Sequence, residues 1–306
     1  MKRSVGIGAV IFILVFMTAC SRLSGFDSPA PTDTVRAPTR APAVASDTPE
    51  MPRQLVFIDR LEGWEAVKSD FVAALEQLTA DQGWEFLAYQ AIPDEAIWIQ
   101  ASLIVVLGGG VELTSMIEAN PQASFLLVAV PGSTPGERVA VIGPEGMGAD
   151  QAAFLSGYIS ALTTANWRVG MIAMGDTGEV QAALAGFLNG AVYFCGLCRP
   201  GYPPFHAYPT TAFVQGSDSS DLDNGLQQLA ALGVSTIGLT AEFSSEAVDL
   251  IVGSANNDRT VWIGPNPPLE AHRATWIATV RPDPASALLQ VWESLLQGEA
   301  DILMPM

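Results

Sequence analysis

The order of apolar and amphipathic segments constrains the fold of this chain more than any other feature. From Gln54 onward, short continuous apolar runs alternate with stretches whose apolar residues recur every three or four positions. Gln54–Asp59 is typical of a buried strand, and Trp64–Ala80 has the apolar spacing of a helix. Strands without polar alternation, each followed by a helix, indicate a parallel sheet that is covered on both faces.

The same pattern continues along the chain and then begins again in its second half. It predicts further strands at Trp84–Tyr89, Leu103–Leu107, Ser124–Val130, Arg138–Ile142, Arg168–Met174, Ala207–Val214, Thr236–Thr240, Val261–Gly264 and Trp276–Val280. It predicts further helices at Glu112–Ala119, Ala149–Thr164, Gly178–Val192, Leu222–Leu232, Phe243–Ser254 and Asp283–Leu296. In the helix Ala149–Thr164, the bulky residues that share one face are Phe154, Leu155, Tyr158, Ile159 and Leu162.

Two successive α/β halves of similar size predict two doubly wound lobes with parallel sheets. We expect the N-terminal lobe to contain residues 54–146 plus about 280–306, and the C-terminal lobe residues 147–279. A cleft between two such lobes is the expected place for a ligand.

The N-terminus has the layout of a secretory signal. Lys2 and Arg3 precede the apolar run Val5–Met17, which is shorter than a membrane span and is followed by Thr18, Ala19 and Cys20. A cysteine after small residues resembles the bacterial lipobox, whose thiol is acylated. We therefore expect a signal peptide over residues 1–20, lipidation of Cys20, and a location on the extracytoplasmic face of the cell membrane. An ordinary signal peptide with a coincidental cysteine is the alternative.

The segment that follows the signal differs in composition from the rest of the chain. Residues 21–53 contain six prolines, many Ala, Ser and Thr residues and no hydrophobic periodicity. Such a segment cannot bury enough apolar surface to offset its conformational entropy. We expect it to be an extended tether between the membrane and the folded part.

The charge of the chain argues against one class of partner. The net charge is −18, with 14 Lys and Arg residues against 32 Asp and Glu residues. Binding to nucleic acid depends on Lys and Arg side chains that neutralise phosphates. We therefore expect no nucleic-acid partner, and we attribute the acidity to solubility.

Three blocks in the second half carry a more specific pattern. Asp150–Gly157 reads Asp-Gln-Ala-Ala-Phe-Leu-Ser-Gly, Trp167–Ile172 reads Trp-Arg-Val-Gly-Met-Ile, and Ala185–Ala191 reads Ala-Gly-Phe-Leu-Asn-Gly-Ala. In order and spacing they resemble the basic membrane protein family of substrate-binding lipoproteins, which has a Q-x-x-F/Y-L-x-G helix, a K-V-G-x-I/V-G strand and a G-F-x-x-G helix. The resemblance covers most of Leu103–Leu296.

This resemblance implies a type I periplasmic-binding-protein fold, in which two Rossmann-like lobes are joined by a hinge. It also implies a receptor that passes a small-molecule solute to an ABC permease in the membrane. Several family members take nucleosides. Those members carry an Asp after the strand equivalent to Val261–Gly264, where this chain has Pro265–Pro268. The carboxylate expected to hold ribose hydroxyls is therefore missing, which argues against specificity for nucleosides themselves. We expect a small polar solute, nucleoside-like or related. We also expect a monomer.

Ligands of parallel sheets bind beyond the carboxyl ends of the strands, and the candidate ligand-binding residues follow from that rule. Trp64 has a ring that can stack on a solute, and Gly108 and Gly109 let backbone amides approach it. The others are polar side chains in loops that follow predicted strands, namely Asp59, Asp176, Thr240 and Asn266. The alternatives are structural, because a strand-end Gly is often a turn and a strand-end Asp is often a helix cap.

Two cysteines in a C-x-x-C arrangement offer a competing hypothesis. Cys195 and Cys198 follow a predicted helix and enter a Gly/Pro-rich loop, whereas a thioredoxin-like pair would open a helix. We favour a structural disulfide over a thiol oxidoreductase. A metal site with His206 would have at most three ligands, so we expect no metal.

Enzyme motifs are otherwise missing from the sequence. It contains no Walker loop, H-E-x-x-H or G-x-S-x-G pattern, and its two histidines lie in weak contexts for a triad. We expect no enzyme activity and no cofactor. A sensory or regulatory lipoprotein of the same fold is the alternative to a transport receptor.

Overall fold

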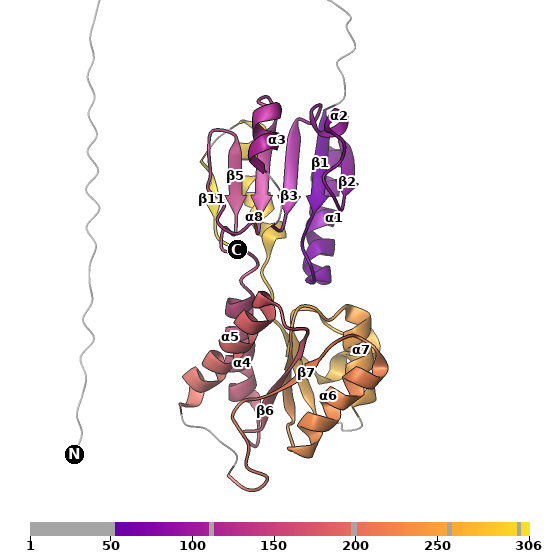
Figure 1. The fold of residues 1–306 in the computed structure, drawn as a ribbon, viewed down its shortest axis with the longest axis vertical. Helices are drawn as coiled ribbons and strands as arrows, with labels where there is room; N and C mark the ends of the chain where they lie inside the picture. Colours follow the sequence, from indigo (N-terminus) through magenta and orange to yellow (C-terminus); the bar gives the residue numbers. More distant parts are fainter. Residues whose placement is uncertain (1–52, 110–112, 197–200, 256–258, 299–300) are drawn as a thin grey trace, which may run out of the picture. The chain divides into compact units, whose positions relative to one another are not determined.

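The computed structural model describes residues 53–109, 113–196, 201–255, 259–298 and 301–306. They belong to one compact unit, Glu50–Met306. This unit contains two sheets, in which every pair of neighbouring strands is parallel (Figure 1). The predicted α/β fold class with parallel sheets is therefore confirmed.

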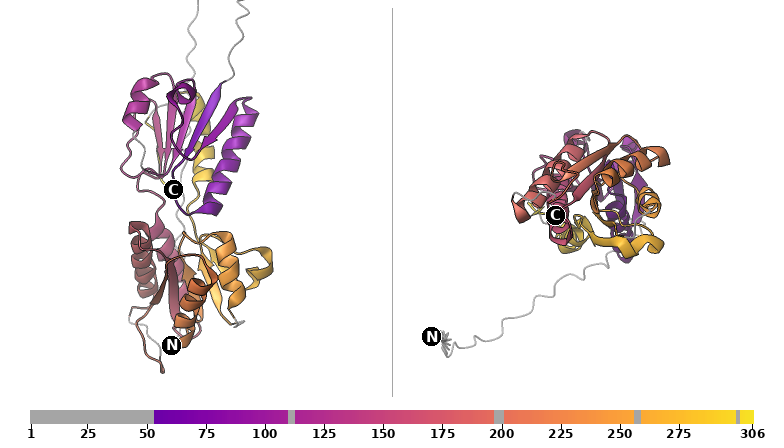
Figure 2. Two further views of the ribbon diagram at one scale, coloured as in Figure 1. Left: turned by 45° about the vertical axis from the view of Figure 1, so that its right-hand side comes forward. Right: turned by 90° about the horizontal axis from the view of Figure 1, so that it is seen from below.

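The first sheet has six strands in the order β11-β5-β4-β3-β1-β2. Its strands are β1 (Gln54–Asp59), β2 (Glu85–Tyr89), β3 (Leu103–Leu107), β4 (Ser124–Val128), β5 (Val139–Ile142) and β11 (Leu303–Met304). β3 is buried at every position, because helices cover both faces. α1 (Glu65–Asp81) and α8 (Pro284–Leu296) lie beside each other on one face (Figure 2), and α2 (Glu95–Trp98) and α3 (Leu113–Ala119) cover the other.

The second sheet has five strands in the order β10-β9-β8-β6-β7. Its strands are β6 (Val169–Met174), β7 (Thr210–Val214), β8 (Thr236–Leu239), β9 (Val261–Gly264) and β10 (Trp276–Thr279). α4 (Ala149–Thr163) and α5 (Gly178–Cys195) pack on one face, and α6 (Ser219–Ala231) and α7 (Ser245–Ser254) on the other. A short 3-10 helix, η1 (Glu270–Thr275), precedes β10.

Local sequence signals account for where several helices begin. Thr177 accepts a hydrogen bond from the backbone of Val180 at the start of α5, and Ser244 caps α7 in the same way. Asp283 caps α8, whose first turn holds Pro284, where the missing N–H costs nothing. Strand ends are thus followed closely by helix starts, which keeps the connecting loops short.

The face of α4 that is buried is not the face that carries its bulky residues. The helix buries small residues, namely Ala153, Ser156, Gly157, Ser160 and Ala161. On the bulky face, the side chains of Leu155 and Leu162 are 51% and 56% exposed. The small residues face inward because α5 packs so closely against α4 that larger side chains would not fit.

The chain passes between the sheets in two segments. Residues 143–148 lead from β5 to α4, and residues 280–283 lead from β10 back to α8. β11 then adds to the edge of the first sheet beside β5. Within the described ranges, no helix is long and apolar enough to cross a membrane.

Several predicted features lie outside the described residues. They include the signal segment with Cys20, the tether and Cys198. Cys195 is the last residue of α5, but its side chain is also outside the description, so the disulfide stays a prediction.

Candidate functional site

Loops at the carboxyl ends of strands from both sheets meet at Trp64. Gly63 and Trp64, which follow β1, have left-handed backbone angles, with φ of 66° and 56°. In this conformation the backbone N–H of Trp64 donates to the carbonyl oxygen of Ala241, after β8, at 3.1 Å. The turn before α1 is therefore docked on the loop that leaves the second sheet.

Asn266, in the loop after β9, fixes this contact. Its side chain is 1% exposed, and its Nδ2 donates to the carbonyl oxygens of Ala241 (3.1 Å) and Phe243 (2.7 Å). Its Oδ1 accepts from the backbone N–H of Ala66, in the first turn of α1, at 3.3 Å. One buried amide thus ties two loops of the second sheet to the start of α1.

The Trp64 side chain fills the space between these loops. It is 2% exposed and packs with Val67, Ala129, Met147 and Ala241. The remaining cavity, which we call the strand-end crevice, has a volume of about 20 Å³. Its lining is Trp64, Ala149, Ala152, Ala153, Ser156, Met171, Ala183, Leu239, Thr240, Ala241, Glu242, Pro265 and Val280. Small-molecule sites usually measure roughly 300–1,000 Å³, so the crevice with Trp64 in this position is too small for a solute.

Two polar atoms at the crevice are buried without a hydrogen-bond partner in the described part of the chain. They are Nε1 of Trp64, which is a donor, and Oε2 of Glu242, which is an acceptor. A buried polar group without a partner costs about 1–3 kcal/mol. The crevice therefore offers one donor and one acceptor that a ligand can satisfy.

Negative charge is concentrated around the same loops. Burial raises the pKa of the Glu179 carboxyl, at the start of α5, and the charges of Glu242 and Glu62 raise it further. Glu62 directly precedes Gly63, and a Cβ on Gly63 would lie 3.5 Å from Cα of Glu242. Of the three carboxylates, Glu242 lines the crevice, and its charge and that of Glu62 act on the carboxyl of Glu179 in the first turn of α5.

The predicted ligand-binding residues divide into two groups. Trp64 and Thr240 line the crevice, and Asn266 lies beside it. The Thr240 side chain is already engaged, because its Oγ1 accepts from the backbone N–H of Met174 at 3.3 Å. Asn266 is engaged at both ends of its amide. Trp64 alone among the three retains an unused polar atom.

Asp59 and Gly108 lie together at the carboxyl ends of the neighbouring strands β1 and β3. Oδ1 of Asp59 accepts from the backbone N–H of Leu61 at 3.0 Å, and its Oδ2 lies 3.8 Å from Nζ of Lys68. Gly108 has a φ of +83°, and a Cβ there would lie 2.7 Å from the backbone nitrogen of Leu61. Both residues shape the loop that presents Trp64.

The structure places the remaining two predicted residues outside the lining of the crevice. Gly109 lies next to Pro131, and the exposed Asp176 accepts from Nε2 of Gln181 at 2.5 Å. Glu242, Glu179 and Glu62 were not singled out from the sequence. Glu242 could have been found by the rule used for the other candidates, because it is a polar residue in the loop directly after a predicted strand, three residues beyond Leu239.

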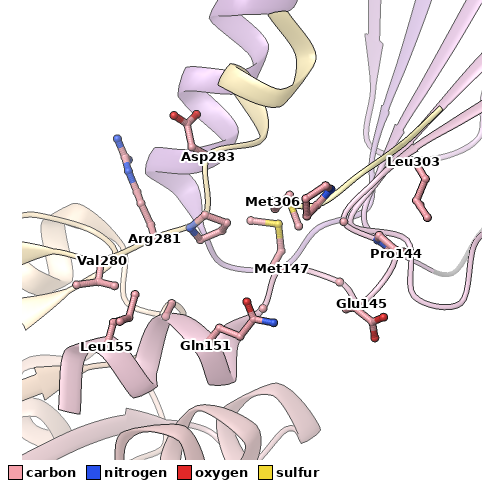
Figure 3. Close-up of a pocket in the computed structure, with 16 residues that line it drawn as sticks. Pro144, Glu145, Met147, Gln151, Leu155, Val280, Arg281, Asp283, Leu303 and Met306 are labelled. Atoms are coloured by element: carbon pink, nitrogen blue, oxygen red, sulfur yellow. The ribbon is translucent and has the colours of Figure 1, made fainter. Parts of the chain in front are cut away.

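A second cavity, which we call the junction pocket, lies where residues 143–148 and 280–283 pass between the sheets. It has a volume of about 590 Å³ and is lined mainly by Gly, Pro and aliphatic residues. Figure 3 shows Met147 and Met306 in its centre, and the two pack in one apolar cluster. Arg281 and Asp283 in its lining have structural partners, since Arg281 donates to Asp70 at 2.6 Å and Asp283 caps α8, and Glu145 and Gln151 are its other charged or amide side chains. The crevice, with unused polar atoms, is the better candidate for a polar solute.

Comparison with known proteins establishes the fold. No protein-family model matches the sequence, and no curated protein matches it. A solved solute-binding protein of an ABC transporter system from Aeropyrum pernix K1 is similar with a TM-score of 0.59 and 15% identity, covering 83% of this chain and 74% of that chain. One from Conexibacter woesei DSM 14684 has a TM-score of 0.58 and 15% identity, covering 83% and 84%.

A transcriptional regulator of the LacI family from Enterococcus faecium, solved with bound ribose, is also similar. Its TM-score is 0.55 at 12% identity, and the match covers 82% of this chain and 94% of that chain. These similarities confirm the type I periplasmic-binding-protein fold. At identities of 12–15% these similarities establish the fold and nothing more. The narrower resemblance to the basic membrane protein family stays a prediction.

Proposed function

We propose that the chain is the solute-binding receptor of an ABC importer, and that it holds a small polar solute in the strand-end crevice without catalysing a reaction. The observation that carries the proposal is the pair of buried, unpartnered atoms at the crevice, Nε1 of Trp64 and Oε2 of Glu242. They belong to loops that follow strands of different sheets. The similarity to ABC solute-binding proteins supports the same role.

Binding requires the Trp64 side chain to move. The crevice of about 20 Å³ holds no more than one water molecule, whereas the ring of Trp64 fills the space between the loops. A solute therefore takes the place of the indole or stacks against it after the loops separate. The turn at Gly63 and Trp64, with its left-handed backbone, is the natural moving part.

A DNA-binding regulator is the second function that the fold similarity raises. The net charge of −18 argues against it, because DNA binding needs a basic surface. The segment before β1 is rich in Pro, Ala and Thr and lacks the apolar periodicity of a helical DNA-binding domain. A sensory lipoprotein would use the crevice in the same way and differ only in its membrane partner.

The proposal includes a lipid anchor at Cys20, which rests on the sequence of the N-terminal segment. In cells given labelled palmitate, the wild-type chain should incorporate the label and sediment with membranes. Cys20→Ala should remove the label from the chain and release a fraction of it from the membrane pellet. A labelled Cys20→Ala chain would contradict the anchor.

Thermal unfolding of the full chain in detergent, with single nucleosides, sugars, amino acids and amines, tests the receptor role. A solute at 100 times its dissociation constant stabilises a protein by about 2.7 kcal/mol, which here corresponds to a rise of roughly 5–10 °C in melting temperature. The variant Leu303→Ala, at the junction pocket, should keep the full rise. A rise that this variant abolishes would move the solute to the junction pocket, and a flat panel would contradict the receptor role.

A further inference from the structure

Three glutamates in and near the crevice carry negative charge that no observed ion pair of the described residues neutralises. Glu62 follows β1, Glu242 follows β8, and Glu179 lies in the first turn of α5. Oε2 of Glu242 has no hydrogen-bond partner among the described residues. The ion pairs of the described part join Asp59, Asp249, Glu270 and Asp70 to cations, and none of them includes these three glutamates.

Repulsion by neighbouring carboxylates affects the pKa of Glu179. The pKa of Glu179 is raised by its burial first, and then by the charges of Glu242 and Glu62. A folded protein that brings three like charges together without a counterion loses stability by doing so. A bound cation that does not belong to the chain would remove this cost by neutralising the carboxylates.

Trp64 supplies an independent observation at the same place. Its side chain is 2% exposed, it lines the same cavity as Glu242, and its Nε1 lacks an acceptor. An indole face attracts ammonium and guanidinium groups, and the attraction strengthens when the cation is desolvated. The indole N–H at the edge of the ring can donate a hydrogen bond to a carboxylate or hydroxyl of the same solute.

A bare metal ion fits the crevice less well than an organic cation. Among the described residues, no group of three or more His, Cys, Asp and Glu side chains is placed to hold a metal ion. An ammonium or guanidinium group needs a carboxylate and an aromatic ring, and Glu242 and Trp64 supply both in the lining of the crevice.

We propose that the solute of the crevice is a small organic cation with an ammonium or guanidinium group, which is neutralised by Glu242 and Glu179 and covered by the ring of Trp64. This inference rests on the proposed receptor function and specifies the class of its solute. Glu62, which is exposed, contributes to the field at the entrance.

Isothermal titration calorimetry on the full chain in detergent tests the inference with matched pairs of probes. Methylguanidine is compared with methylurea, and putrescine with 1,4-butanediol, since in each pair only the first member carries an ammonium or guanidinium charge. We expect at least one cationic probe to bind at least tenfold more tightly than its neutral partner. Its affinity should fall as the salt concentration rises.

Two variants and one control locate the charge recognition. Glu242→Gln and Glu179→Gln each keep the side-chain shape and should weaken binding of the cationic probe at least tenfold. Glu179 serves as the second variant, because it lies outside the lining of the crevice and its replacement leaves the wall intact if Glu242→Gln disturbs folding. Glu76→Gln, on the exposed side of α1, should leave the affinity unchanged.

The outcomes separate this inference from the receptor function. Equal binding of charged and neutral partners, or full binding by both glutamine variants, overturns the cationic class. If a neutral solute from the thermal panel binds while no cationic probe does, the receptor function stands and the cationic class falls. If no solute of either kind binds, both are overturned.

Discussion

Asn266 illustrates how one side chain joins segments that are distant in the sequence. Its amide donates to the carbonyl oxygens of Ala241 and Phe243 and accepts from Ala66, which is 200 positions away in the chain. Like Trp64 it is buried, and unlike Trp64 it uses its polar atoms in hydrogen bonds. Its role is to hold the loops that frame the crevice.

Replacing Asn266 by Ala should lower the free energy of unfolding by about 1–3 kcal/mol, because the carbonyl of Phe243 would be left buried without a donor. Urea unfolding measures the change. Asn189→Ala, at an exposed position of α5, serves as the control and should change the free energy by less than about 0.5 kcal/mol. Equal effects of the two substitutions would show that Asn266 does not hold the loops.

Glu179 should make stability depend on pH. A carboxyl whose pKa is raised in the folded state contributes stability below its ordinary pKa of 4.5, and this contribution is lost as the pH rises through the raised pKa. The melting temperature of the wild type should therefore decline as the pH rises above 4.5 more steeply than that of Glu179→Gln. Glu76→Gln should follow the wild type. Parallel curves for the wild type and Glu179→Gln would contradict the raised pKa.

Sequence reasoning reached the loops of the site but not the use of each side chain. Trp64, Thr240 and Asn266 could be placed beyond strand ends because a parallel sheet puts all these loops at one edge. Whether a polar group there is free depends on partners far along the chain. The partners of Asn266, at separations of 23, 25 and 200 residues, cannot be read from local patterns.

At the scale of elements, the closest packing in the protein is between α4 and α5. A Cβ added to Gly186 would overlap the carbonyl oxygen of Asp150, and one added to Gly190 would overlap that of Phe154. Gly157 on α4 meets the carbonyl of Phe187 in the same way. These glycines let the two helix backbones touch, and α4 contributes Ala149, Ala152 and other small residues to the wall of the crevice.

Gly190→Ala should therefore lower the free energy of unfolding by about 1–3 kcal/mol, because the added methyl forces the helices apart. Gly178→Ala, in the same helix, meets nothing within 4 Å. It should leave stability unchanged or raise it by up to about 1 kcal/mol, since Ala favours helix. Chemical denaturation compares the two variants. An equal effect of both substitutions would contradict the close packing.

The elements were predictable where a long apolar pattern existed. The strands and the longer helices lie within a few residues of the expected positions, as for β3 (Leu103–Leu107) and α4 (Ala149–Thr163). α2, η1 and β11 were not predicted, because segments of four, six and two residues are too short to show a period. The inward face of α4 was also not evident, since its small residues and its bulky residues both repeat at helical spacing.

At the scale of the whole molecule, the described unit joins two parallel sheets by two segments, and the strand ends of both frame one crevice. Trp64 fills that space, and its Nε1 and Oε2 of Glu242 have no hydrogen-bond partner among the described residues. In the proposed receptor, solute binding would exchange apolar contacts of Trp64 for contacts that satisfy these polar atoms. The account thus depends on the crevice being the place where a solute binds.

The most direct test is a crystal structure of the full chain grown with the solute that gives the largest rise in melting temperature. The account predicts electron density for the solute between Trp64 and the loop of Thr240 and Glu242, with the indole moved from its place in the solute-free protein. Density in the junction pocket beside Met147 and Met306, with Trp64 still filling the crevice, would contradict it.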